Sequence, residues 1–218
     1  MGFLINSFIE FPVAGFFFED DFSSDNWTDI GSNIGVAGGV LAGVYIRNGN
    51  NASWIDMTGS SLSDTEWVAR FQYNVKTVTA SGTNFSFFGV SDANGNTGAV
   101  NGRDGLGIEI LLDGGAPSFK MNHPNAQGWN DNTTTMSSTP SVAIYYVQWQ
   151  RISSTSYTIN LYSDSGFSTL IESKNATIDS GIVSLRYLVD QSLNAGSSGA
   201  TIAIDIDDIQ IKDGTSTF

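Results

Sequence analysis

The chain has 218 residues, of which 40% are hydrophobic and none is cysteine. It can therefore bury a full core without disulfides, and it offers no thiolate as a metal ligand or nucleophile. Its 22 acidic and 9 basic residues give a formal net charge of −13. Such a charge excludes nucleic acid as a partner and disfavours anionic membrane surfaces, because both carry negative phosphate groups.

The first 15 residues, MGFLINSFIEFPVAG, are apolar but fit neither a secretion signal nor a membrane-spanning helix. A secretion signal begins with basic residues and has an uninterrupted apolar stretch, and a membrane helix needs about 20 apolar residues. Here the first basic residue is Arg47, and Asn6, Glu10 and Pro12 break the apolar run. We therefore expect no membrane insertion through this segment.

Two interpretations of this N-terminal segment remain open. In the first, residues 3–11 and 16–22 are strands of the domain itself. In the second, residues 1–15 are an arm that docks on a partner subunit, with Pro12 and Gly15 as its hinge. The apolar side chains of such an arm are Phe3, Leu4, Ile5, Phe8, Ile9 and Phe11.

The remaining chain is typical of short β-strands, because no stretch of ten or more residues keeps a helical periodicity. In EWVARFQYNV, apolar residues alternate from Trp67 to Val75 while the residues between them are mostly polar, as in a half-buried antiparallel strand. Further strands are predicted at residues 40–46, 52–57, 84–91, 105–112, 117–121, 143–152, 156–162, 182–189 and 200–211. So many strands without helices predict an all-β fold, a sandwich or a barrel, over residues 16–218.

Two connections between these strands carry predictions of their own. The short stretch RISSTSYT joins residues 143–152 to residues 156–162, which predicts a β-hairpin. The later stretch SGFSTLIES is the one segment with helical spacing of its apolar residues, at Phe167, Leu170 and Ile171. At this length it predicts one turn of helix at most.

The isoleucines of the last strand, TIAIDIDDIQIKDG, change phase. They stand at even positions up to Ile206 and at odd positions from Ile209. In a regular strand this change would turn the second group toward the opposite face of the sheet. The pattern therefore predicts a β-bulge at Asp207–Asp208, where one extra residue restores the phase.

Five phrases share an order and spacing with a known family: DDFSSDNWTDIGSNIGV, SDTEWVARF, TPSVAIYYVQWQRISSTSYTINLYSDSGFSTLIES, SLRYLV and IDIDDIQIKDG. Over about residues 18–214 the chain resembles a concanavalin A-like lectin/glucanase (laminin-G-like) domain. The branch it resembles occurs in marine archaeal surface proteins and in viral and phage structural proteins. The resemblance implies a jelly roll, an antiparallel β-sandwich of two curved sheets, with ligand sites, where present, on loops of the concave face.

The residues that the glucanases of this superfamily use for hydrolysis are not evident. Those enzymes carry Glu-x-Asp-x-x-Glu on one strand, and retaining hydrolysis needs two carboxyl groups about 5–5.5 Å apart. The nearest candidates, Glu109 and Asp113 in GIEILLDGG, have the wrong spacing and lack the second glutamate. The single histidine, His123, lies in a loop-like stretch and is expected to be solvated, and the chain has no Gly-x-Ser-x-Gly elbow. We therefore predict no enzymatic activity.

Calcium is the one cofactor for which ligands are available, because loop oxygens are plentiful. The stretch DANGNTG begins like an EF-hand loop, but the expected glycine is Thr97 and the twelfth position is Arg103. The candidate ligands are Asp92, Asn94 and Asp104. Ordinary turn chemistry explains these residues equally well.

A glycan site needs an exposed aromatic ring with amide and carboxylate partners, because sugars combine an apolar face with hydroxyl groups. The stretch NAQGWNDN offers Trp129 among Asn125, Asn130 and Asp131. The alternative is a loop aromatic folded onto the edge of the sandwich. The other tryptophans lie in or beside strand patterns and are expected in the core: Trp27, Trp54, Trp67 and Trp149.

These observations favour a non-enzymatic structural protein, and we expect a virion component such as a capsid decoration, fibre or tail protein. It would dock through its N-terminal segment as a homo-oligomer or onto other virion or surface proteins. The alternative is a carbohydrate-binding or adhesin module of a cell surface, with Trp129 at its site and glycans as partners. A polysaccharide hydrolase is a remote third hypothesis. The expected location is a virion or an extracellular surface.

Overall fold

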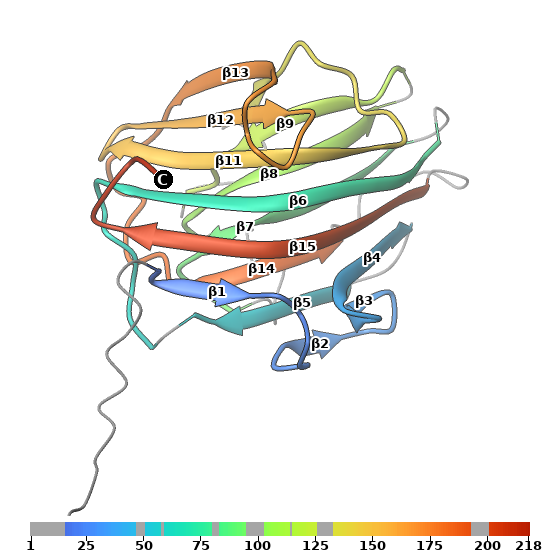
Figure 1. The fold of residues 1–218 in the computed structure, drawn as a ribbon, viewed down its shortest axis with the longest axis horizontal. Helices are drawn as coiled ribbons and strands as arrows, with labels where there is room; N and C mark the ends of the chain where they lie inside the picture. Colours follow the sequence, from blue (N-terminus) through green and yellow to red (C-terminus); the bar gives the residue numbers. More distant parts are fainter. Residues whose placement is uncertain are drawn as a thin grey trace, which may run out of the picture.

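A computed structural model describes residues 16–46, 51–57, 59–79, 83–94, 103–113, 115–125, 133–192 and 201–218. Two antiparallel β-sheets, here called sheet A and sheet B, pack face to face, and sheet A lies in front in Figure 1. The predicted all-β sandwich is thus confirmed. The predicted arm lies outside the described residues, and so does the boundary at residue 15, so both stay predictions. No helix in the described residues could cross a membrane.

The strand order of each sheet shows that sequence neighbours are often separated in space. Sheet A runs in the order β13 (Leu170–Thr177), β12 (Ser156–Tyr162), β11 (Ala143–Ser153), β6 (Trp67–Val78), β15 (Thr201–Asp213), β4 (Val40–Ile46) and β3 (Ile34–Ala37), and β1 (Phe18–Asp20) also pairs with β15. Sheet B runs in the order β10 (Thr133–Thr135), β9 (Ser118–Asn122), β8 (Gly105–Asp113), β7 (Thr83–Ser91), β14 (Tyr187–Ser192), β5 (Asn51–Asp56) and β2 (Thr28–Ile30). The hairpin of β11 and β12 confirms the predicted connection.

The hydrophobic core fills the space between the two sheets. On β6 the alternating residues from Trp67 to Val75 are buried, as their spacing predicts. The rings of Trp67, the first residue of β6, and Trp149 on β11 meet edge to face, with their centroids 4.8 Å apart. The outward residues of β11, β6 and β15 are left to form one solvent-facing surface.

The bulge predicted in the last strand is present. Between Asp207 and Gln210 the pairing of β15 with β6 advances three residues on β15 for two on β6. Asp208 adopts a φ of 52°, in the left-handed region. Ile206 and Ile209 consequently both point into the core and are fully buried. The bulge also lies where β15 changes its other neighbour from β4 to β1.

The stretch SGFSTLIES forms no helix, which is within the predicted limit of one turn. The stretch forms a turn that leads into β13 at Leu170, and Phe167 has a φ of 52°. The carboxylate of Asp164 binds the backbone of this turn and prevents a helix. β13 escaped sequence prediction because it is an edge strand with mostly exposed residues.

The strand predicted at residues 182–189 starts only at Tyr187. The N–H groups of Val183 and Ser184 donate to side-chain carboxylates of Asp104 and Asp64 instead of to a neighbouring strand. Ser184 also has a φ of 61°, which an extended strand does not allow. Side-chain contacts from distant loops therefore override the apolar pattern of this segment.

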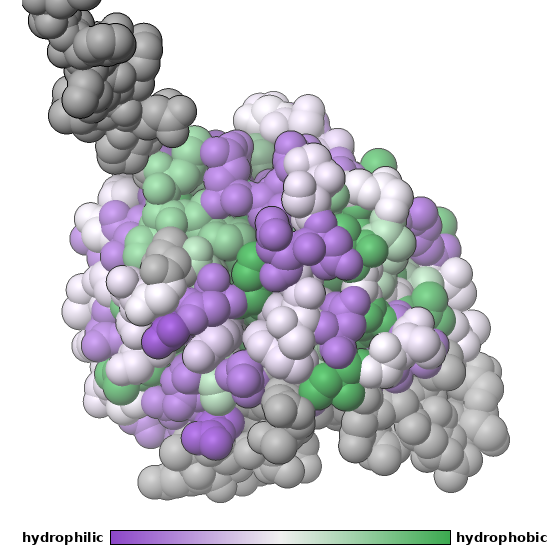
Figure 2. All heavy atoms as spheres, turned by 90° about the horizontal axis from the view of Figure 1, so that it is seen from below, coloured by the Kyte–Doolittle hydropathy of each residue, from purple (hydrophilic) through white to green (hydrophobic). Residues whose placement is uncertain are grey.

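Surface hydropathy does not mark a binding site on the side of the molecule seen from below. In this view hydrophilic and hydrophobic residues are interspersed over the described surface (Figure 2).

Candidate functional site

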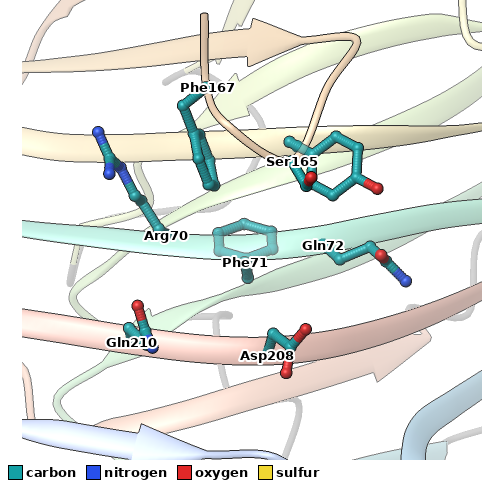
Figure 3. A pocket seen from close by; sticks show the side chains of 8 residues that line it. Arg70, Phe71, Gln72, Ser165, Phe167, Asp208 and Gln210 are labelled. Atoms are coloured by element: carbon teal, nitrogen blue, oxygen red, sulfur yellow. The ribbon is translucent and has the colours of Figure 1, made fainter.

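A groove of about 290 Å³ lies on the outer face of sheet A (Figure 3). Small-ligand sites usually begin near this size. The outward side chains of three adjacent strands, β11, β6 and β15, form its floor, and the connection between β12 and β13 forms its wall. The groove is lined by Arg70, Phe71, Gln72, Tyr146, Ser165, Phe167, Asp208 and Gln210.

The wall is the turn of residues 163–169, which is organised by a single carboxylate. Asp164 accepts hydrogen bonds from the backbone N–H groups of Gly166, Ser168 and Thr169 and from the Ser168 hydroxyl, at 2.6–3.3 Å. These hydrogen bonds lower the pKa of Asp164, and the bond from the Thr169 backbone N–H has the largest effect. The turn thereby holds Phe167 in a left-handed conformation that costs about 1–2 kcal/mol for an L-residue.

Phe167 stands over the floor of the groove and is seen nearly edge-on in Figure 3. The guanidinium carbon of Arg70 lies 4.4 Å from the centre of its ring. The ring of Tyr146 lies 6.0 Å from it at an angle of 74°, and that of Tyr162 lies 5.6 Å from it at 72°. Because the two rings are nearly perpendicular, Phe167 forms a wall of the groove and Tyr146 forms part of its floor.

Two rows of side chains cross the strands under this wall. The first, here called the Arg70 row, consists of Gln148, Arg70, Gln210 and Glu19, which are directly paired across β11, β6, β15 and β1. The Arg70 guanidinium donates to the Gln148 carbonyl oxygen from Nε at 2.9 Å and from Nη2 at 2.7 Å. Gln210 donates to Glu19 at 3.1 Å. The centre of the Phe218 ring also lies 4.4 Å from the Arg70 guanidinium carbon. Each polar side chain of this row therefore already has a protein partner.

The second row, here called the Tyr146 row, consists of Tyr146, Gln72 and Asp208. Tyr146 is paired with Gln72 across β11 and β6, and Gln72 is paired with Asp207 on β15, immediately before the bulge. Tyr146 and Gln72 are half-buried and Asp208 is exposed. None of these three side chains makes a hydrogen bond to another described residue. An aromatic ring, an amide and a carboxylate are therefore available to a ligand.

The glycan site predicted around Trp129 lies largely outside the described residues, since Trp129, Asn130 and Asp131 are not among them. Asn125 is described, and its amide donates to the Asp179 carboxylate at 3.1 Å. The site therefore stays a prediction.

Of the three predicted calcium ligands, the structure brings two together. The Asp104 N–H donates to the Asp92 carboxylate at 3.2 Å, and the Asp92 N–H donates to the Asp104 carbonyl at 3.1 Å. Burial and the nearby Asp104 carboxylate raise the pKa of Asp92. Asn94 is exposed. The described residues contain no group of three or more acidic or histidine side chains suited to a metal ion, so calcium also stays a prediction.

The acidic residue considered for hydrolysis, Glu109, is buried on β8 and accepts a hydrogen bond from the Asn122 amide at 2.5 Å. Burial raises its pKa to about 7. The side chain of Asp113 lies outside the description. Glu109 is thus a buried carboxyl group bonded to an amide.

The prediction of a solvated loop histidine was wrong. His123 is 7% exposed and lies against the ring of Tyr157, 6.0 Å between centroids. It directly follows β9, so the strand carries it under the core ring of β12. Burial lowers its pKa from the usual value.

No protein-family model matches the chain, and no curated protein matches it. Solved structures do match. The lectin UEA-II, in a complex with galactose, has a TM-score of 0.59 at 12% identity, over 89% of this chain and 97% of that one. The chain has a concanavalin A-like lectin fold.

Two further solved structures that match the chain carry different names. The CBM2 module of the evolved Dit of Lactobacillus casei BL23 phage J-1 has a TM-score of 0.57 at 10% identity, over 94% of this chain and 98% of that one. A glycosyl hydrolase family protein from Mycobacterium fortuitum has a TM-score of 0.51 at 12% identity, over 90% and 99%. At these identities the likeness establishes the fold alone.

Sequence reasoning did not find the groove. Tyr146 and Gln72 occupy the outward positions of their strands, which the alternating pattern marks only as the face away from the core. Phe167 was assigned to a helical pattern. The one available signal was the predicted bulge, because bulges often redirect a side chain next to a binding site.

Proposed function

We propose that this protein is a non-enzymatic carbohydrate-binding module. The Tyr146 row beside Phe167 carries this proposal. A sugar ring has an apolar face, which packs on an aromatic ring, and hydroxyl groups, which need amide and carboxylate partners. The groove offers all three kinds of partner without hydrogen bonds among themselves. The likeness to a lectin complexed with galactose and to a CBM2 module supports the same class.

A hydrolase is less well supported. Glycoside hydrolysis ordinarily takes a pair of carboxyl groups on either side of the scissile bond. Asp208 is the one carboxylate among the described residues that line the groove. Glu109 is buried and bonded to Asn122.

We place the module at a virion or extracellular surface, attached through residues 1–15 as a homo-oligomer or to another virion protein. The apolar composition of that segment and the likeness to a phage module support this placement. Light scattering on the full chain and on a chain that starts at Phe16 tests the attachment. For a homo-oligomer we expect an assembly that is lost on truncation, and a full chain that is already monomeric would contradict the homo-oligomer.

The binding function is tested by titrating the full chain on a broad glycan panel. The Tyr146→Ala variant removes the stacking surface and should weaken binding by about tenfold or more, which corresponds to about 1.4 kcal/mol. Ile144→Ala changes an exposed residue of the same strand and face outside the groove, and should bind like the wild type. We also propose Trp129, with Asn125, Asn130 and Asp131, as a separate glycan contact, and Trp129→Ala in the same assay tests it. Absence of any glycan binding by the wild type would reject the function.

A further inference from the structure

We propose that the groove selects neutral saccharides with two adjacent free hydroxyl groups, and that Asp208 determines this selectivity. This inference rests on the proposed function. It begins with the β-bulge, which inserts Asp208 between the regular pairs of β15 and β6. The bulge leaves Asp208 exposed among the residues that line the groove (Figure 3).

The chemistry of Asp208 restricts what can bind beside it. An ionised carboxylate only accepts hydrogen bonds, so a ligand must supply donors. No described residue supplies one: the N–H of Asp208 itself donates to Asp207 at 2.9 Å, and its carboxylate makes no hydrogen bond. Two adjacent hydroxyl groups can donate one hydrogen bond to each carboxylate oxygen.

The neighbouring positions add the other parts of a saccharide site. Tyr146 and Gln72 belong to the same row as Asp208, and they are paired across neighbouring strands, which lie about 4.8 Å apart. The Tyr146 ring offers an apolar surface, and the Gln72 amide both donates and accepts hydrogen bonds. A polyhydroxylated ligand with an apolar face matches this order of groups.

The charges around the groove disfavour an acidic sugar. Asp207 adjoins Asp208 in the bulge, and Asp21 and Asp205 act electrostatically on Asp207. Among the described residues that line the groove, Arg70 is the one cation, and its guanidinium donates to Gln148 and contacts the rings of Phe167 and Phe218. A uronic or sialic acid would thus bring a second acceptor-only group to a negatively charged edge, without a free cation to offset it.

The experiment compares neutral glycans with uronic-acid analogues of the same linkage, using the full chain. The wild type should bind the neutral member at least about tenfold more tightly, and methylation of one of the two adjacent hydroxyls should remove the preference. Asp208→Asn should weaken neutral binding by about tenfold and bring the two analogues within about threefold of each other. Asparagine tolerates the left-handed conformation, so the bulge should persist.

The control for the loss of a negative charge alone is Asp25→Asn, which changes an exposed residue outside the groove lining. It should keep wild-type affinity and selectivity. Equal or tighter binding of uronic-acid analogues by the wild type would overturn this inference, as would an Asp208→Asn variant with unchanged selectivity. Either result leaves the proposed function standing if Tyr146→Ala still weakens glycan binding. If the wild type binds no glycan at all, the proposed function itself fails.

Discussion

The Arg70 row and the Tyr146 row both cross β11, β6 and β15, face the same side of sheet A and share Phe167 as a neighbour. They differ in how their polar groups are used. In the Arg70 row the guanidinium donates to Gln148, and the Gln210 amide donates to the Glu19 carboxylate. The Gln148 amide in turn donates to Gln150 on the same strand. In the Tyr146 row no side chain is bonded to another described residue. Outward polar residues of a sheet can therefore serve stability or binding, and their hydrogen bonds distinguish the two roles.

The largest expected effect is a pH dependence of the free energy of unfolding, which comes from two buried carboxyl groups. Burial raises the pKa of Asp190 and of Glu109 to about 7, from ordinary values of 3.8 and 4.5. Between these values the folded protein holds more protons than the unfolded chain, so the free energy of unfolding should fall as the pH rises. The expected slope is about 1.4 kcal/mol per pH unit for each group.

Denaturant unfolding at pH 5, 6 and 7 measures this slope. Asp190→Asn should reduce it by the contribution of one group. Asp164→Asn is the control, because its carboxyl group is exposed and its pKa is lowered, which places its titration below this range. A free energy of unfolding that stays constant or rises from pH 5 to 7 in the wild type would refute the prediction.

Arg70 and Gln72 test the two rows most directly, because they are neighbouring outward positions of β6. Arg70→Ala loses two hydrogen bonds from a charged group and two ring contacts, and should lower the free energy of unfolding by about 2 kcal/mol. Gln72→Ala should change it by less than about 0.5 kcal/mol but should weaken glycan binding. Denaturant unfolding and a glycan titration of both variants measure the contrast. If Gln72→Ala destabilised the fold as much as Arg70→Ala, the distinction between the rows would be lost.

The smallest expected effect comes from the two rings that cover Arg70, both 4.4 Å from it. Phe218→Ala should cost about 0.5 kcal/mol in stability and leave glycan binding unchanged, because Phe218 does not line the groove. Phe167→Ala should cost about 1 kcal/mol and weaken binding as well, because it removes the wall. Thermal unfolding and glycan titration separate the two, and identical binding by both variants would show that Phe167 is no part of the site.

The amino-acid sequence by itself determined the fold class, most strand positions, the β11–β12 hairpin and the bulge in β15. Each of these depends on neighbours within about ten residues, because burial on one face of a strand imposes a period of two. The change of isoleucine phase at Asp207–Asp208 is the clearest example, since the extra residue is visible in the chain itself.

Only the tertiary structure decided the groove. Its rows exist because residues near positions 70, 146 and 208 become neighbours through the register of three strands, which no local pattern encodes. The same holds for Phe167, whose position depends on the Asp164 turn, and for His123, which lies under Tyr157 of another sheet. Periodicity determines which face of a strand is buried, whereas the long-range pairing of strands determines which outward side chains meet.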